Sequence, residues 1–163
     1  MNIMPKSFQY LQQDCQLTLR QGVEEYTAGY SHLNKNDGAS EESRWFFCHD
    51  CTHVLFGTIP FEIKGESIND VWTLFGTDMT LKNYFKFFQF VDYGVVLNSY
   101  VKTYGSKWRV YLALIGLIPT CIKPMIRGWR MNKEWDWFNP EPYLDKPLAE
   151  IRKEFGVKVI ASK

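Results

Sequence analysis

The sequence predicts a mainly α protein that folds as one helical bundle. Apolar residues recur every three or four positions along most of the 163 residues, which is the spacing of a helix with one buried face. Outside the last residues, no segment of useful length alternates between apolar and polar residues as a half-buried strand does. A chain of this length with 45% hydrophobic residues suits one domain with its own core. We therefore expect residues 1–163 to form a single helical domain.

The first half of the chain is expected to hold three helices. Apolar residues at loosely helical spacing predict the first helix between Ser7 and about Tyr30. The polar segment Asn34–Ser40 contains a glycine and predicts a loop. The segment Thr58–Gly65 is expected to be irregular, and a short helix should follow from about Ser67 to Phe75.

The second of these helices has clear signals at both ends. Ser40 is expected to be its N-cap, and Glu41 and Glu42 lie in the first turn, where the helix dipole favours negative charge. The helix should run through about Phe56 and end at Gly57.

The second half of the chain is expected to be helical at four places, each an apolar segment at helical spacing: Leu81–Tyr104, Lys107–Ile118, Lys123–Arg130 and Leu148–Phe155. Pro119 should interrupt the helix before it, and Gly156 should end the last one. The apolar tail Val157–Ala161 suggests a short C-terminal strand.

Composition limits the classes of partner. Nineteen Lys and Arg residues against eighteen Asp and Glu residues give a formal net charge of +1, so no overall field attracts nucleic acid, and no nucleic-acid partner is expected. Aromatic residues make up 17%, and such side chains fill cores or line sites for flat and apolar ligands. The first residues lack the apolar segment of a secretory signal, which favours a cytoplasmic protein with reduced cysteines.

Two of the three histidines, His49 and His53, lie one helical turn apart in the Ser40–Phe56 segment. Two neutral imidazoles at this spacing are typical of divalent-metal sites, as in the His-Glu-x-x-His helix of zinc proteases. The alternative is a pair of core histidines that are hydrogen-bonded to backbone or carboxylate groups. Asp50 lies about 100° round the helix from His49. It could supply an oxygen ligand, orient an imidazole, or lie at the surface.

The same stretch contains a Cys-x-x-Cys spacing at Cys48 and Cys51, which could be half of a zinc knuckle or a redox pair. The other half of a knuckle is missing, because Cys15 and Cys121 are isolated. A redox pair usually opens a helix, where the dipole lowers the thiol pKa, whereas this pair lies about two turns inside one. We therefore expect Cys48 and Cys51 to take no part in metal binding or redox chemistry.

Two stretches of the chain resemble a known family. The first reads His49-Asp50-x-x-His53-Val54-Leu55-x-Gly57, followed by Gly65-Glu66, and the second is the run Pro147–Val157. Together they resemble the Coq4 family of ubiquinone-biosynthesis proteins, whose signature is His-Asp-x-x-His with a Glu about a dozen residues on. Twelve residues separate His53 from Glu66, where the family has eleven. A looser resemblance, to phosphohydrolases with a His-Asp pair, lacks further histidine ligands, since only His32 lies outside the motif.

The resemblance implies a helical protein that binds one divalent metal ion, zinc first, through His49, Asp50, His53 and Glu66. Periodicity alone would instead place Glu66 at the surface. The implied function is C1 oxidative decarboxylation of a prenylated hydroxybenzoate in ubiquinone biosynthesis, through this metal. The alternative is a non-catalytic prenyl-lipid-binding scaffold that gathers the other quinone-biosynthesis proteins at the membrane.

A membrane partner is also indicated by the segment after Val110. Its apolar run to Ile118 is shorter than the roughly 20 residues that span a bilayer. Basic and aromatic residues follow it, which is a pattern of membrane interfaces: Lys123, Arg127, Trp129 and Arg130. These residues are the candidates for contact with lipid at the cytoplasmic membrane, and the alternative is an ordinary solvated basic face.

Overall fold

The computed structural model describes residues 8–29, 40–60 and 62–160, and within these ranges the chain is helical with no strand. The eight α-helices are α1 (Leu19–Gly29), α2 (Glu41–Phe56), α3 (Ile63–Gly76), α4 (Leu81–Tyr84), α5 (Val91–Tyr104), α6 (Lys107–Gly116), α7 (Ile118–Trp129) and α8 (Leu148–Phe155). Three short 3-10 helices accompany them: η1 (Gln9–Leu11), η2 (Phe85–Gln89) and η3 (Glu141–Tyr143). The predicted mainly α class is confirmed. Ser7, Tyr30, His32 and residues 34–39 lie outside the described ranges.

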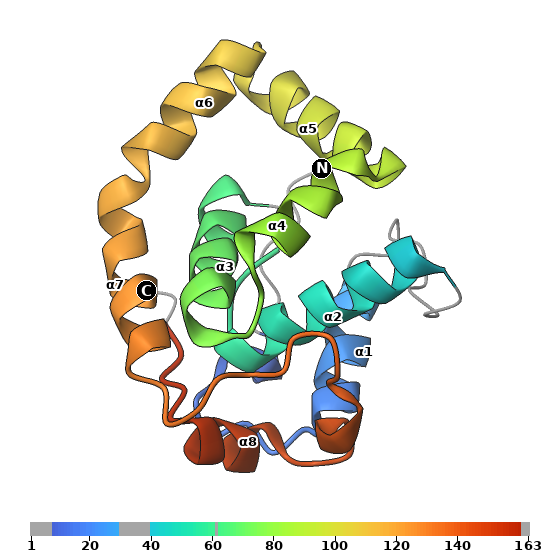
Figure 1. The fold of residues 1–163 in the computed structure, drawn as a ribbon, viewed down its shortest axis with the longest axis vertical. Helices are drawn as coiled ribbons and strands as arrows, with labels where there is room; N and C mark the ends of the chain where they lie inside the picture. Colours follow the sequence, from blue (N-terminus) through green and yellow to red (C-terminus); the bar gives the residue numbers. More distant parts are fainter. Residues whose placement is uncertain (1–7, 30–39, 61, 161–163) are drawn as a thin grey trace.

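Helix α2 lies at the centre of the molecule and packs against α1, α3 and α8 (Figure 1). Both of its predicted ends are confirmed. The Ser40 hydroxyl accepts a hydrogen bond from the amide of Ser43, and Gly57 ends the helix in the left-handed conformation, at φ 68°. All residues from Cys51 to Phe56 are buried, because other helices cover every side of this end of α2.

A buried arginine ties the two ends of the chain to α2. Arg152 of α8 is fully buried and donates to four main-chain carbonyls, those of Tyr10, Gln12, Val54 and Leu55. Two of these carbonyls belong to the last turn of α2, where no further helical amide is available to them and the helix dipole favours a cation. The guanidinium therefore fixes the N-terminal segment and α8 to the end of the central helix.

Several predicted boundaries were wrong because local periodicity missed caps and tertiary contacts. The first helix begins only at Leu19, since Thr18 and Gln21 form a reciprocal capping box. Helix α3 begins at Ile63 rather than Ser67. The predicted helix Leu81–Tyr104 is divided into α4, η2 and α5.

The break before α5 comes from Phe90, whose backbone is extended and whose ring packs against Trp45 and Phe46 of α2. The predicted C-terminal strand was also wrong over Val157–Ile160. There the main chain bonds to the Gln13 side chain rather than to a neighbouring strand. Ala161 lies outside the described residues.

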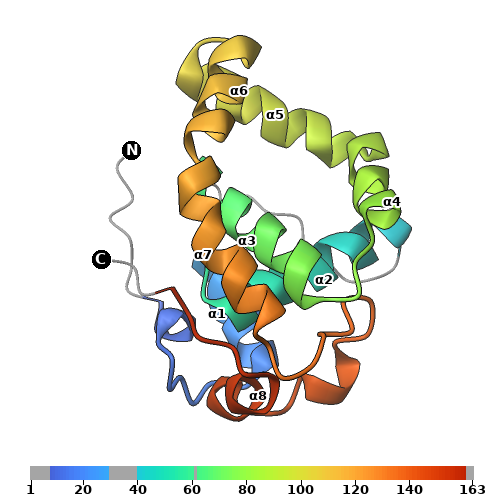
Figure 2. The same cartoon turned by 60° about the vertical axis from the view of Figure 1, so that its left-hand side comes forward.

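Helices α5 and α6 extend away from the α1, α2 and α8 core, and α7 returns along α3 (Figures 1 and 2). Pro119 lies in the first turn of α7, so it begins a new helix as well as ending the previous one. Among the described residues, no single helix has the length and apolar composition of a membrane span. Helices α6 and α7 meet these criteria only as a pair, and they are bent by 56° with respect to each other.

Candidate metal centre

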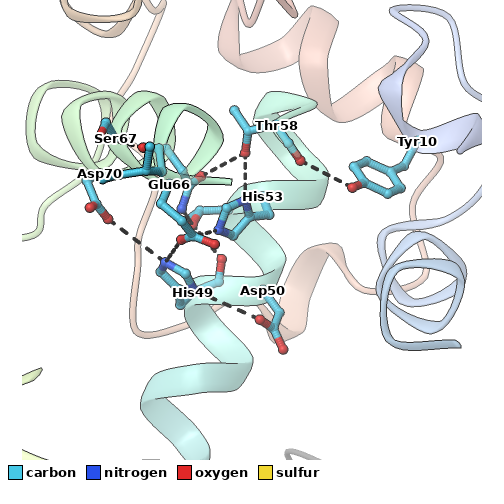
Figure 3. A network of polar contacts seen from close by, with 11 residues as sticks. Tyr10, His49, Asp50, His53, Thr58, Glu66, Ser67 and Asp70 are labelled. Carbon is cyan, nitrogen blue, oxygen red and sulfur yellow. Dashed lines mark hydrogen bonds and ion pairs between the residues drawn. The ribbon is translucent and has the colours of Figure 1, made fainter. Parts of the chain in front are cut away.

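Two pairs of side chains face each other across α2 and α3 (Figure 3). His49 and His53 lie one turn apart on α2, and Glu66 and Asp70 lie one turn apart on α3. Glu66 Oε2 is 3.1 Å from His53 Nε2 and 3.7 Å from His49 Nε2, and Asp70 Oδ1 is 4.0 Å from His49 Nε2. Ligand atoms about 2.1 Å from a shared ion lie roughly 3 to 4 Å from one another, so this spacing suits a metal site.

A chain of hydrogen bonds favours one position for the proton of His53. The Thr52 hydroxyl donates to the carbonyl of His49, so it accepts from the amide nitrogen of Asn69. The amide oxygen of Asn69 then accepts the proton of the Thr58 hydroxyl. Because that proton is used, the Thr58 oxygen, 2.8 Å from His53 Nδ1, accepts from the ring. This network favours the tautomer of His53 that carries its proton on Nδ1.

The lone pair of His53 Nε2 then points at the Glu66 carboxylate, 3.1 Å away. Two acceptors at this distance repel each other unless a proton or a metal cation lies between them. His53 is fully buried, and Glu66 has only 21% of its side chain exposed, so water screens this repulsion poorly. Metal-binding histidines typically donate their other N–H to a neighbouring group, as His53 does to Thr58. The pair is thus arranged to receive a cation.

His49 is held in the same orientation by different neighbours. Its ring stacks on Trp45, with the centroids 5.2 Å apart, and its Nε2 faces Glu66 and Asp70. Burial disfavours protonation of this imidazole, but the carboxylates of Asp50, Glu66 and Asp70 outweigh burial and raise its pKa. The site attracts positive charge as a result, whether a proton or a metal ion supplies it.

The structure brings three of the four predicted ligands together. Among the described residues, His49, His53 and Glu66 form a group whose ligand atoms all lie within 4.8 Å of one another. Asp50 is not in this group, because its Oδ1 lies 3.9 Å from Nδ1 of His49, on the far side of the ring from Nε2. The carboxylate of Asp50 accepts a hydrogen bond from the Tyr26 hydroxyl. The pKa of Tyr26 is raised by burial first, and then by the charges of Asp50 and Glu66 and by this hydrogen bond. Asp50 thus occupies the orienting position that the sequence left open.

Glu66 reaches the site because of Gly65. A Cβ atom at position 65 would lie 1.8 Å from the carbonyl oxygen of Ile59, so only glycine allows the preceding segment to lie this close to α3. The helix therefore begins early, and Glu66 faces α2 rather than solvent, which corrects the placement from periodicity. Asp70 was missed, although its position four residues after Glu66 was the available signal.

The neighbouring thiols lie in apolar surroundings. Cys48 and Cys51 are fully buried, and burial raises the pKa of Cys48 to about 12 and that of Cys51 well above its usual 9.0. Metal binding and redox exchange need a thiolate, which these surroundings disfavour. The structure thus supports the interpretation that both cysteines take no part in metal binding or redox chemistry.

An open pocket of about 510 Å³ lies beside the site, between α3, α6 and α7. Most of its lining is apolar: Val71, Phe75, Leu114, Ile118, Cys121, Ile122 and Met125, with Ser67 and Asp70 on the α3 side. Asp70 thus belongs both to this pocket and to the surroundings of His49. The hydroxyl of Tyr100 in α5 is buried without a hydrogen-bond partner in the described part of the chain, and burial followed by the charges of Glu66 and Asp70 raises its pKa.

The predicted lipid-contacting residues differ in their surroundings. Lys123 and Arg130 are exposed, and Trp129 has 64% of its surface exposed, although its ring contacts Phe75. Arg127 is less exposed and donates to the carbonyl of Lys158, so it is tied to the C-terminal segment. Burial lowers the pKa of Arg127.

No family model, curated protein or solved structure matches this chain. The resemblance to the Coq4 family thus depends on the two sequence stretches alone.

Proposed function

We propose that the protein binds one divalent metal ion, zinc first, through His49, His53 and Glu66, and acts on a prenylated aromatic acid. One observation carries the proposal: both imidazoles present Nε2 to a carboxylate within 4.0 Å, and the protonated Nδ1 of His53 is directed to Thr58. A mixed set of nitrogen and oxygen ligands is typical of catalytic zinc sites. When bound, the ion would polarise a carboxylate or phenolate of the substrate.

The pocket beside the site supports an amphipathic substrate. Its volume of about 510 Å³ is in the range of small-molecule sites, and its apolar lining suits a prenyl tail. Each buried CH₂ contributes about 0.8 kcal/mol, so tail length should control affinity while the ion controls the chemistry. Ser67 and Asp70 are the polar residues in its lining, on the α3 side that faces the metal site, so we place the head group of the substrate at this end of the pocket.

The reaction we propose is the one that the Coq4 resemblance implies, C1 oxidative decarboxylation of a prenylated hydroxybenzoate by a lyase of ubiquinone biosynthesis. The bond between C1 and the carboxyl carbon breaks, CO₂ leaves and a hydroxyl group takes its place, with dioxygen as the oxidant that accepts the two electrons. The apolar tail of such a substrate favours a membrane over water. Helices α6 and α7 carry many exposed apolar side chains: Trp108, Tyr111, Leu112, Leu114, Ile115, Ile118, Ile122, Ile126 and Trp129. With Lys123 and Arg130 beside them, these residues suit peripheral binding at the cytoplasmic membrane.

The same exposed residues favour a second candidate function, a non-catalytic scaffold. Most of them lie outside the lining of the pocket, and large exposed apolar patches mark contacts with membranes or proteins. In this role the protein would hold a prenyl lipid and gather other quinone-biosynthesis proteins, and the ion would stabilise the fold.

Metal analysis tests the first part of the proposal. Protein purified without chelators, or supplied with zinc, should hold about one ion per chain. His49→Ala and His53→Ala should each lose the ion while circular dichroism shows intact helix content. The double variant Cys48→Ser with Cys51→Ser is the matched control and should keep its ion. The proposal would be contradicted by wild-type protein that never takes up zinc. It would also be contradicted by loss of the ion in the variant without the two thiols.

Turnover separates the two candidate functions. The metal-loaded protein is incubated with a prenylated hydroxybenzoate under air, with and without a chelator, and the decarboxylated product is measured. Chelator-sensitive product formation supports the enzyme. Tight binding of tailed analogues without turnover supports the scaffold, and equal affinity for tailed and tailless head groups contradicts a prenyl pocket in both.

A further inference from the structure

We propose that Asp70 is a fourth protein ligand of the metal ion, on the side of the site that opens to the apolar pocket. This inference rests on the proposed function, because it presupposes that the ion binds at His49, His53 and Glu66. It adds a residue that no motif in the sequence singled out.

The positions of the four residues along their helices support this assignment. Each helix contributes two side chains that are four residues apart, so each pair lies on one face. Glu66 lies nearest His53, and Asp70, one turn later, lies 4.0 Å from Nε2 of His49, one turn earlier. The two pairs therefore run in opposite directions, which places Asp70 next to His49, at the edge of the group that His49, His53 and Glu66 form within 4.8 Å of one another.

The charges of the four residues match a divalent cation. Two carboxylates contribute two negative charges, and two neutral imidazoles add none, so a divalent ion leaves the group neutral. Without an ion, Glu66 and Asp70 repel each other in a partly buried site, where only 21% and 33% of their side chains are exposed. A cation bound between the two carboxylates removes this repulsion, so coordination by both is electrostatically favourable.

The surroundings of Asp70 suit a ligand rather than a freely moving surface side chain. The hydroxyl of Tyr84 in α4 donates a hydrogen bond to its carboxylate, which restricts the orientation of Asp70. Coordinating carboxylates typically have such a partner. Asp70 also lines the apolar pocket. A molecule held in that pocket would therefore meet the ion beside Asp70.

The test compares metal binding in the wild type, Asp70→Asn and Asp70→Glu. Asparagine keeps the size of the side chain but removes the charge, and glutamate restores a carboxylate on a longer arm. Glu134→Gln, at an exposed residue, is the matched control for loss of one negative charge. Zinc affinity is measured by competition with a chromophoric chelator, and the ligand field is measured by visible absorption of the Co²⁺-loaded proteins. Helix content is checked by circular dichroism, and Asp70→Ser serves if Asp70→Asn does not fold.

We expect Asp70→Asn to weaken zinc binding by roughly 10- to 100-fold or more and to change the Co²⁺ spectrum. Asp70→Glu should recover part of the affinity, and Glu134→Gln should behave as wild type. Unchanged affinity, or lower affinity with an unchanged Co²⁺ spectrum, would overturn the role as a ligand and leave the three-residue site standing. Wild-type protein that binds neither Zn²⁺ nor Co²⁺ would overturn the proposed function as well.

Discussion

At the scale of single residues, a side chain of the candidate metal site can lower the stability of the ion-free fold. Asp70 is the clearest case, because burial raises its pKa from the usual 3.8 to about 6. In the folded, ion-free protein this side chain therefore binds a proton more readily than it does in the unfolded chain. Stability of the ion-free protein should consequently fall as the pH rises from about 4 through 6, and it should stay lower above that range.

Asp70→Asn should remove this cost and make the ion-free protein more stable at pH 7.5. A pKa unit corresponds to about 1.4 kcal/mol, and partial exposure reduces the effect, so we expect a gain of about 1 to 2 kcal/mol. Urea unfolding in the presence of a chelator measures it. The gain should shrink at pH 4.5, and Glu134→Gln should show no comparable gain. Equal stability of wild type and Asp70→Asn at both pH values would contradict the unfavourable burial of this carboxylate.

Arg152 is the opposite case, a buried charge that stabilises the fold. Its guanidinium satisfies four carbonyls from two distant segments, and burial lowers its pKa to about 10, so it stays charged at neutral pH. Arg152→Ala should cost about 3 to 5 kcal/mol of unfolding free energy, because four carbonyls lose their partner inside the core.

Arg152→Lys should also destabilise the protein, since an ammonium group has three donors and no planar fork. Arg20→Ala is the control. Arg20 bonds to Asp145 at the surface, with half of its side chain exposed, so its loss should cost far less than the loss of Arg152. Chemical denaturation of the three variants makes the comparison, and an Arg152→Ala protein as stable as Arg20→Ala would show that the buried bonds contribute little.

At the scale of helices, the pocket depends on how closely α7 approaches α3. The two helices cross where Gly76 faces Gly128, and a Cβ atom on Gly128 would lie 2.9 to 3.0 Å from the backbone of Phe75 and Gly76. Residues this small are needed for such a close crossing, because a side chain on either would push the helices apart. The wall of the pocket that α7 supplies is therefore set by this contact.

Gly128→Ala should move α7 and destabilise the protein by about 1 to 3 kcal/mol, as overpacking typically does. It should also weaken binding of tailed quinone analogues while the metal content stays the same. Gly116→Ala is the matched control, since a Cβ at Gly116 in α6 would meet no atom within 4 Å. Thermal unfolding and ligand titration provide the readouts. If both alanine variants bind and unfold alike, the crossing does not shape the pocket.

At the scale of the whole molecule, the fold separates the candidate metal centre, which is partly buried, from an apolar outer arm. The arm consists of α6 and α7, and basic residues lie beside its exposed apolar side chains. We expect weak, reversible binding to anionic vesicles, and Lys123→Glu with Arg130→Glu should reduce it severalfold because each basic residue near such a surface contributes about 1 kcal/mol. Arg127 is a poorer choice than the sequence suggested, since its side chain holds the carbonyl of Lys158.

Vesicle sedimentation at low and high salt measures this binding, and salt should weaken the electrostatic part. Arg20→Glu with Lys153→Glu makes the same charge change on exposed residues of α1 and α8, and it should have a smaller effect. Loss of binding in both double variants would point to net charge rather than to the arm.

The sequence by itself determined the central helix and the two histidines of the candidate metal centre. Ser40 and Gly57 mark the ends of α2, and the four-residue spacing of His49 and His53 places both imidazoles on one face. These features depend on interactions between residues less than one or two turns apart, which the order of the residues specifies. The single domain and the membrane partner stay predictions of the sequence.

Only the tertiary structure decided which carboxylates face the histidines. Glu66 faces α2 because Gly65 lets the carbonyl of Ile59 approach α3 closely. Asp50 lies on the Nδ1 side of the His49 ring, away from α3, so it does not face the two Nε2 atoms. Phe90 likewise breaks a helix that periodicity predicts, since its ring packs on α2. Such outcomes depend on contacts between segments far apart in the chain. Local propensities of a few tenths of a kcal/mol cannot outweigh the burial of an aromatic ring or the close approach of two backbones.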